Sequence, residues 1–332
     1  MEKKVARISV VPSGQTFDCP VDETIMRAAV RAGIGFPYSC NVGSCGNCRF
    51  ELIEGDVRHL RADAPAWSER DLKRNRWLGC QAAPIGDCTI KFRADDKFGS
   101  GPAPLCRKGR LVGTQDITRD IRAFDFEVDQ APDFIAGQYA LLSTAGIEGG
   151  RPYSFSNLPA SNIWTFMIKK VPGGKLTAFL FDDIKPGDEI DLDGPWGIAT
   201  FDPTAPRDVV LIAGGSGLSP MVSIAHRFAS APEMKGRKLH FYYGARQSRD
   251  LFAPDILPAA PEIHLVNVLS EPDEAWKGQA GFVHKAVEAD LGPRLANHEI
   301  YFAGPAVMSA EIQRMAHVAG VPMTQLHFDE FY

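Results

Sequence analysis

The stretch YSCNVGSCGNC, residues 38–48, gathers thiols more densely than any other part of the chain. Three cysteines fall within nine positions, at Cys40, Cys45 and Cys48. Gly43 and Gly46 separate them, and glycine permits positive φ angles and close backbone approach because it has no Cβ. Such a loop can wrap around a metal group and point its N–H groups at the sulfur atoms.

A fourth thiol completes the pattern at Cys80, in the stretch RWLGCQA. The spacing C-x4-C-x2-C…C is that of plant-type ferredoxins, in which four thiolates hold a [2Fe–2S] cluster, two on each iron. A zinc site or reactive free thiols are the alternatives. Structural zinc usually takes two C-x2-C-like pairs, and only one short pair occurs here. We therefore predict that Cys40, Cys45, Cys48 and Cys80 bind a [2Fe–2S] cluster, and that Cys19, Cys88 and Cys106 are structural or incidental.

Size and composition indicate a globular protein of more than one domain. The chain has 332 residues, and a chain of this length usually folds around more than one hydrophobic core. Hydrophobic residues make up 45% and charged residues 23%, which is ordinary for a globular protein. No apolar run reaches the length of a membrane span, and the N-terminus has no cleavage-site pattern, so we expect a cytoplasmic protein. The net charge of −5 argues against nucleic acid as a partner, and the first 95 residues are near neutral.

The secondary structure predicted on either side of the cysteine loop is typical of a ferredoxin. Residues 5–11 and 15–21 can pair as a hairpin around Ser13-Gly14. A helix is predicted next, capped by Asp22 or Thr24 and ended by Gly33, and its core-facing stripe is Ile25, Ala28, Ala29 and Ala32. RFELIEGDV then predicts a strand and turn. Residues 1–95 resemble the β-grasp ferredoxin domain along their length.

A Gly- and Pro-rich linker, residues 96–106, separates this domain from a run of short strands in residues 107–203. In WTFMIKKV, Trp164, Phe166 and Ile168 share one face while Thr165, Met167 and Lys169 share the other, which predicts a strand. KPGDEIDLDGPWG adds a turn, another strand and a Gly-Pro loop. Several short strands with turn signals between them predict an antiparallel β-barrel or sandwich.

Two motifs in this region, RPYS at 151–154 and KKVPGGKLT at 169–177, are weak individually. Without further context Arg151 could be a surface charge and Tyr153 a strand residue. In this order they resemble the FAD-binding barrel of the ferredoxin–NADP reductase family. The resemblance implies that Arg151 pairs with the FAD pyrophosphate, to which a fork-shaped cation is suited. It places Tyr153 against the flavin and Ser154 near flavin N5, where hydride arrives, so that Ser154 is a predicted catalytic residue.

The second motif supplies further FAD contacts if the resemblance holds. Lys169 and Val171 would line the edge of the flavin. Gly174 through Thr177 would offer backbone and hydroxyl donors to the phosphates. The alternative is that Gly173-Gly174 is an ordinary hairpin turn.

Residues 204–332 have the pattern of an α/β domain with a parallel sheet. DVVLIAGGSGLSPMVSIAHRFAS, 208–230, predicts a buried strand, a glycine turn and a helix. Pro220 suits the first helical turn, Ser219 is a predicted N-cap, and Met221, Ile224, Ala225 and Phe228 form a core-facing stripe. A helix start of this kind favours phosphate. The motif is G-x-G-x-x-P instead of the dinucleotide fingerprint G-x-G-x-x-G, and this departure resembles the reductase family. The predicted nucleotide contacts are Gly214, Gly215, Ser216, Gly217 and Pro220.

Two further strand ends should lie at the same edge of the sheet. FYYGAR, 241–246, ends at Gly244 and Arg246, and IYFAGPAVM, 300–308, reaches Gly304 and Pro305. Open α/β sheets bind ligands at this carboxyl edge; the alternative is an α/β domain with ordinary turns. Arg246 and Arg249 could accept a 2′-phosphate, but YGAR followed by DLF resembles the branch of the family that uses NADH, which we favour over NADPH.

The chain closes with HFDEFY, residues 327–332. Such a segment could dock as an ordinary apolar strand. In the resembled family a terminal aromatic residue shields the flavin, and Phe331 is the matching position, predicted to be catalytic because nicotinamide must displace it. Asp329 and Glu330 would then be electrostatic neighbours of the flavin.

The order ferredoxin, FAD barrel, NAD domain resembles the reductase components of bacterial aromatic oxygenases, both toluene-type monooxygenases and carbazole-type dioxygenases. The resemblance spans essentially the whole chain and implies electron transfer from NADH through FAD and the cluster to a terminal oxygenase or its ferredoxin, by a monomer. A stand-alone NADH-dependent flavin or quinone reductase, or a non-catalytic redox sensor, is the alternative. A sensor would need only one of the three cofactors.

Overall fold

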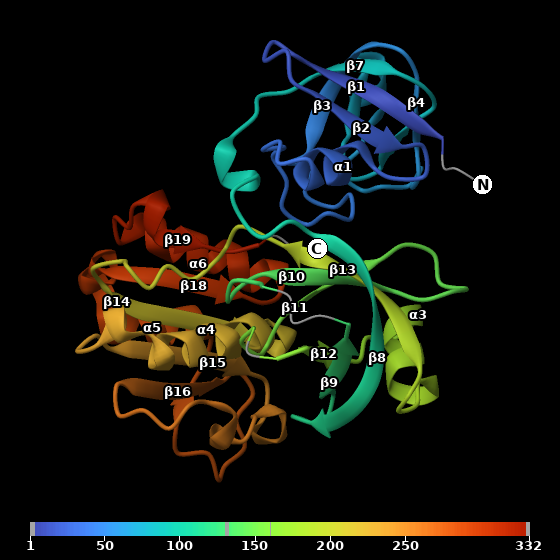
Figure 1. Ribbon diagram of the computed structural model, residues 1–332. Coiled ribbons are helices and arrows are strands. Elements are labelled where there is room, and N and C mark those ends of the chain that lie inside the picture. Colours follow the sequence, from blue (N-terminus) through green and yellow to red (C-terminus); the bar gives the residue numbers. More distant parts are fainter. Residues whose placement is uncertain (1–3, 130–132, 160, 330–332) are drawn as a thin grey trace.

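The computed structural model describes residues 4–129, 133–159 and 161–329. Three bodies follow one another along the chain (Figure 1): a small α+β body, an antiparallel barrel and a parallel α/β sheet. This order confirms the predicted fold class: a β-grasp ferredoxin domain, a β-barrel and an α/β nucleotide-binding domain.

The ferredoxin body contains a five-stranded sheet in the order β2-β1-β7-β3-β5. Its strands are β1 (Val5–Val11), β2 (Thr16–Pro20), β3 (Arg49–Glu54), β5 (Arg76–Leu78) and β7 (Cys88–Lys91). The pair β1 and β7 is parallel and the other pairs are antiparallel. A second, two-stranded sheet joins β4 (Val57–His59) to β6 (Ala82–Pro84). The predicted hairpin and the strand after the cysteine loop are both confirmed.

Helix α1 (Ile25–Arg31) begins after Thr24, as predicted, while α2 (Glu69–Lys73) follows Ser68. The predicted stripe of α1 was wrong at one position. Ala32 is the exposed C-cap residue, since the helix ends at Arg31, one residue before it. Met26 and Val30 are buried instead.

The linker is hydrogen-bonded to the ferredoxin body near both of its ends. It contains a single 3₁₀ turn (Asp96–Phe98) before β8 begins at Leu105. The Asp95 N–H donates to the Gly35 carbonyl at 2.9 Å, and the Arg31 guanidinium donates to the Pro104 carbonyl at 3.2 Å. Both ends of the linker are therefore anchored on the segment that surrounds α1.

The barrel sheet has the order β11-β10-β13-β8-β9-β12, and its pairs are antiparallel. Its strands are β8 (Leu105–Asp116), β9 (Ile121–Val128), β10 (Tyr139–Ser143), β11 (Arg151–Ser154), β12 (Ile163–Lys169) and β13 (Glu189–Trp196). A bridge between Phe155 and Phe166 brings the two outer strands together and closes the barrel. A short helix, α3 (Lys175–Ala178), and a π-helical turn (Phe179–Asp183) follow β12.

The third body is a parallel sheet in the order β17-β16-β15-β14-β18-β19. Its strands are β14 (Asp208–Gly214), β15 (Leu239–Ala245), β16 (Ile263–Leu269), β17 (Gln279–Ala280), β18 (His298–Ala303) and β19 (Leu326–His327). The helices α4 (Leu218–Ser230), α5 (Val283–Leu291) and α6 (Ala306–Val318) cover it. The predicted stripe of α4 is buried at all four positions, which confirms it.

The predicted strand over WTFMIKKV is confirmed, and its second face is also covered: Met167 is buried in one core with α4, while Thr165 and Lys169 are half-buried. One prediction at the junction of the barrel and the parallel sheet was wrong. Ser219 is not the N-cap of α4, which is Gly217. Its hydroxyl instead donates to the Ser154 carbonyl at 2.6 Å and accepts from the Met167 N–H at 3.2 Å. Serine at this position therefore joins the two bodies.

Phe166→Ala should destabilise the barrel by about 3–5 kcal/mol, because it removes a fully buried ring that packs on Phe155 with centroids 5.2 Å apart. Urea unfolding of the apoprotein followed by circular dichroism measures this. The control Val112→Ala, at an exposed position of β8, should change stability by less than about 0.5 kcal/mol. Equal losses in the two variants would contradict this description of the core.

Candidate electron-transfer site

The four predicted cluster ligands are brought together as two pairs. The Cys48 and Cys80 sulfur atoms lie 3.3 Å apart, and the Cys45 thiol hydrogen-bonds to Cys40. Within the described residues no set of three or more His, Cys, Asp or Glu side chains is arranged to hold one metal ion. Two pairs of thiols match the two cysteines that each iron of a [2Fe–2S] cluster takes.

The backbone of the loop supplies donors to the sulfur atoms, as predicted. Cys40 Sγ accepts N–H groups from Val42, Ser44 and Cys45 at 3.3–3.5 Å. The Cys45 thiol and these N–H groups lower the pKa of Cys40 to about 5, and the Cys48 thiol likewise lowers the pKa of Cys80. In each pair the neighbouring thiol thus favours the thiolate form of one sulfur, which is the form that binds metal.

The glycine positions in the loop have the expected geometry. Gly43 and Gly46 have φ angles of 83° and 81°. A Cβ at Gly46 would lie 2.4 Å from the Arg49 guanidinium, so a larger residue would push that side chain off the loop. The donor set, the pairing and this cradle all fit a [2Fe–2S] cluster.

Three arginines that no motif indicated surround the loop. Arg27 donates to the Asn41 side chain and carbonyl at 2.9 and 3.1 Å. Arg49 donates to the Gly46 carbonyl at 3.0 Å, and Arg61 donates to the Val42 carbonyl at 3.2 Å. Their positive charges lie beside four sulfur ligands that become anionic, which stabilises the loop electrostatically. The farthest of them lie 13 residues before Cys40 and 13 residues after Cys48, so the cysteine spacing alone could not reveal them.

Two buried tyrosines fasten the cysteine loop to the barrel. The Tyr139 hydroxyl, from β10, donates to the carbonyl of Ser39, the residue before Cys40, at 2.5 Å. In the opposite direction, the Gly197 N–H donates to the Tyr38 hydroxyl at 3.0 Å. Tyr139 is also paired across the sheet with Ser154. Ser154, the predicted flavin contact, and the cluster loop are thus connected through one residue.

An ion pair strengthens the same interface. Arg31 of α1 contacts Glu23 and also Asp193 of β13, the latter at 2.6 Å. Its guanidinium carbon lies 5.5 Å from the ring centre of Trp196. Tyr139, Leu141 and Trp196 from the barrel belong to the hydrophobic core of the ferredoxin body, so the two bodies share packing as well as hydrogen bonds.

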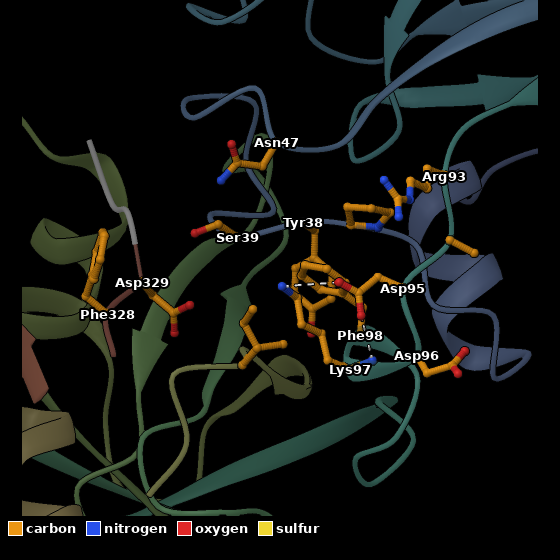
Figure 2. Close-up of a pocket in the computed structure, with 13 residues that line it drawn as sticks. Tyr38, Ser39, Asn47, Arg93, Asp95, Asp96, Lys97, Phe98, Phe328 and Asp329 are labelled. Carbon is orange, nitrogen blue, oxygen red and sulfur yellow. Dashed lines mark hydrogen bonds and ion pairs between the residues drawn. The ribbon is translucent and has the colours of Figure 1, made fainter. Parts of the chain in front are cut away.

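A cavity of about 940 Å³ lies beside the loop. Figure 2 shows Ser39 and Asn47 on one side of it and Phe328 and Asp329 on another, with Asp95 and the linker residue Lys97 opposite. The cysteine loop and the C-terminal segment thus face a common space. Phe331, the residue predicted to shield the flavin, and Glu330 lie outside the described residues.

The predicted FAD residues occupy β11 and the turn after β12. Arg151 is exposed, and its guanidinium is held by the carbonyls of Glu148, Gly149 and Gly150 at 3.1–3.4 Å, which fixes the position of a cation at this strand. Tyr153 is half-buried, and burial raises the pKa of its hydroxyl to about 12. It therefore stays protonated at neutral pH and can donate.

The predicted FAD residues of the second motif, KKVPGGKLT, differ from one another in burial and in contacts. Thr177 is buried, and its hydroxyl lies within hydrogen-bond distance of the Val171 N–H and the Gly174 carbonyl at 3.3 and 3.1 Å, so it holds the turn together. The Val171 side chain is 53% exposed. Lys169 pairs with Asp120 at 3.1 Å and lies near the glycine turn of the nucleotide domain. The Gly174 N–H also donates to the Val171 carbonyl at 3.0 Å, so the turn is held by its own hydrogen bonds.

The nucleotide residues gather at the carboxyl edge of the parallel sheet, as predicted. Gly214 is paired with Gly244, and Ala213 with Ala303, which precedes Gly304 and Pro305. A Cβ at Gly217 would come 2.0 Å from the Ala303 carbonyl oxygen, so only glycine allows this approach of the turn to β18. Ser216 and Arg246 are exposed at this edge, and Pro220 lies in the first turn of α4.

Comparison with known proteins assigns each body. Residues 8–84 match the 2Fe-2S iron-sulfur cluster binding domain, residues 108–201 the oxidoreductase FAD-binding domain, and residues 211–314 the oxidoreductase NAD-binding domain. The chain is therefore an oxidoreductase that combines a [2Fe–2S] cluster, FAD and a nicotinamide nucleotide.

Relatives that match nearly the whole chain show which kind of oxidoreductase it is. The chain is 37% identical over 320 residues to a ferredoxin–NAD(P)+ reductase of Metapseudomonas resinovorans, covering 95% of this chain and 96% of the relative. It is 35% identical to the ferredoxin–NAD+ reductase component of an alkene monooxygenase system of Xanthobacter autotrophicus, covering 96% and 98%. A solved ferredoxin reductase in carbazole 1,9a-dioxygenase superposes with a TM-score of 0.92 at 32% identity, covering all of both chains. The chain belongs to the ferredoxin–NAD(P)+ reductase components of multicomponent oxygenase systems.

Cys80→Ser should abolish the cluster, because one iron would lose a thiolate ligand. Iron and acid-labile sulfide should fall from about two of each per chain toward none, with flavin content retained. Cys106→Ser, at an exposed cysteine outside the motif, is the matched control and should keep both. Zinc in the wild-type protein in place of iron and sulfide would contradict the assignment.

Tyr139→Phe should loosen the cysteine loop, because it leaves the buried Ser39 carbonyl without its donor at a cost of about 1–3 kcal/mol. Hydrogen exchange of residues 38–48 should accelerate. The control Tyr242→Phe removes a hydroxyl that contacts Asp290 in the nucleotide domain and should leave that exchange unchanged. Unaltered protection of the loop in Tyr139→Phe would show that the hydroxyl does not fasten it.

Proposed function

We propose that this chain passes electrons from NADH through FAD and the [2Fe–2S] cluster to the terminal oxygenase, or the ferredoxin, of an aromatic oxygenase. The full-length similarity to the ferredoxin reductase in carbazole 1,9a-dioxygenase is the observation that carries the proposal. Relatives that act with phenol 2-monooxygenase and xylene/toluene monooxygenase support an aromatic substrate for the partner. We also propose a cytoplasmic monomer divided into residues 1–95, 96–106, 107–203 and 204–332.

When bound, the cofactors supply a two-electron hydride acceptor and a one-electron carrier, which together convert hydride transfer into single-electron steps. The chain's own residues bind and orient these groups. Cys40, Cys45, Cys48 and Cys80 would hold the cluster, with the Tyr38 and Tyr139 hydroxyls fixing their loop against the barrel. A fused ferredoxin keeps a high effective concentration beside the flavin strand.

For FAD, Arg151 would pair with the pyrophosphate, and the turn from Gly174 to Thr177 would donate backbone N–H groups. Tyr153 would lie against the flavin. Ser154 would face flavin N5, with its carbonyl already held by Ser219. Lys169 and Val171 would border the flavin edge, and Phe331 would cover the ring until nicotinamide displaces it.

For the nucleotide, the turn Gly214–Gly217 and the start of α4 at Pro220 would hold the pyrophosphate. Gly244, Arg246, Gly304 and Pro305 would line the remainder of the site. Ser219 spans the junction between this helix and the flavin strand. Its two hydrogen bonds join the start of this helix to Ser154 and to Met167.

Anaerobic mixing with NADH should bleach both the flavin and the cluster absorbance within a turnover, with kcat/KM for NADH at least about tenfold above that for NADPH, a difference of about 1.4 kcal/mol. Stopped-flow absorbance measures both. NADH oxidation should then become coupled to product formation when a purified oxygenase component of an aromatic system is added. Rapid reduction of quinones without any such coupling would favour a stand-alone reductase, and absence of bleaching would favour a sensor.

A further inference from the structure

A concentrated patch of positive charge lies on the ferredoxin body. Helix α2 and the strand that follows it carry four exposed cations, which we call the basic face: Arg70, Lys73, Arg74 and Arg76. Glu69 is the exposed acid among them, while Asp71 is buried and paired with Arg49. In the parts of the chain that the structure describes, none of the four cations forms an ion pair. The whole chain has a net charge of −5, so this patch is a local exception.

The basic face is tied directly to the tip of the cysteine loop. Arg49 donates to the Gly46 carbonyl at 3.0 Å and to the Ala66 carbonyl, and it pairs with Asp71 of α2 at 3.3 Å. The loop approaches the surface on this side, since Cys45 is half-buried and Arg49, directly after Cys48, is exposed. Any protein that contacts this tip therefore lies beside α2.

The other end of the basic face leads to the fourth cluster ligand. Arg76 begins β5, which pairs with β3 through Leu78 and Arg49, and Cys80 follows two residues after Leu78. The carbonyl of Cys48 accepts the Gly79 N–H at 2.8 Å. The cations and the sulfur ligands therefore lie on hydrogen-bonded, neighbouring segments.

Apolar surface accompanies the charge. Trp67 and Trp77 stack with ring centres 5.2 Å apart, and both are half-buried. Leu72 of α2 is 52% exposed. Tryptophan and arginine are the residues most enriched at the energetic centres of protein interfaces. A patch that combines both resembles a protein-binding surface more than a solubilising one.

We propose that the basic face is the docking surface for the electron acceptor, and that this acceptor is a protein with an acidic surface. The inference rests on the proposed function and adds the charge of the partner, which the near-neutral composition of the ferredoxin region does not reveal. A cationic patch beside the cluster loop would steer an acidic protein into the orientation that permits transfer. The competing explanation is that these cations only guard the edge strand β5 against association.

The test uses two haem proteins as one-electron acceptors, acidic cytochrome b5 and basic cytochrome c. Each NADH oxidised reduces two ferric haems to ferrous haems and releases one proton. The variant carries Arg70→Glu, Lys73→Glu and Arg74→Glu. The matched control carries the same charge change at exposed lysines of the other two bodies, Lys185→Glu, Lys235→Glu and Lys238→Glu.

At an ionic strength of about 0.01 M, where the Debye length is about 30 Å, kcat/KM of the variant for cytochrome b5 should fall about tenfold. Its kcat/KM for cytochrome c should rise. Surface plasmon resonance should show the same loss of cytochrome b5 binding, and Arg70→Gln with Arg74→Gln should give an intermediate value. Near 1 M salt, where the Debye length is about 3 Å, all variants should converge.

Equal effects of the variant and the control would overturn the proposal, as would a salt-independent change. Binding of the wild type to phosphatidylserine vesicles, lost in the variant while cytochrome b5 turnover is kept, would assign the face to a membrane surface instead. Anaerobic bleaching of flavin and cluster by NADH should be the same in all variants. If the wild type itself fails to bleach, the proposed function fails, which is distinct from failure of the docking surface.

Discussion

The hydrogen bond from the Tyr139 hydroxyl to the Ser39 carbonyl is the contact on which the arrangement of the molecule depends. It joins the residue next to a cluster ligand to a strand residue that is paired with Ser154. Since Tyr139 is fully buried, the bond is shielded from water, and a partner left unpaired there would be costly. The hydrogen bond from the Gly197 N–H to the Tyr38 hydroxyl and the ion pair of Arg31 with Asp193 also join the ferredoxin body to the barrel. The loop therefore cannot rotate relative to the barrel without breaking several contacts together.

Charge is the second constraint. Four sulfur ligands in a buried loop become anionic when they bind iron, and burial without compensation would oppose this. The loop N–H groups around Cys40 and the guanidinium groups of Arg27, Arg49 and Arg61 supply that compensation. Arg49 also pairs with Asp71 of α2. The same side chain therefore offsets the negative charge of the sulfur ligands and holds α2 beside the cysteine loop.

Much of the fold could be predicted because its signals are local. The cysteine spacing, the alternation in WTFMIKKV and the apolar run before GGSG each depend on neighbouring residues, and the structure has a loop, a strand and a buried strand there. The N-cap prediction for Ser219 failed because its partners lie in a different body, while the one at Ala32 failed because α1 ends at Arg31. Met167 and Ser219 face each other across the junction of the barrel and the nucleotide domain, and Tyr139 finds Ser39 one hundred residues earlier. No periodicity within a single element carries that information.

The anchored linker has a consequence for recombination of these reductases. Asp95 and Pro104, near its two ends, hydrogen-bond to Gly35 and Arg31, so residues 95–104 behave as part of the ferredoxin body and not as a flexible tether. A chimera that exchanges only the N-terminal module would separate those partners and place the new cluster in an undefined orientation. Grafting should therefore transfer the connecting segment together with α1, and Asp193 of the recipient barrel should be retained so that the transplanted arginine finds its carboxylate.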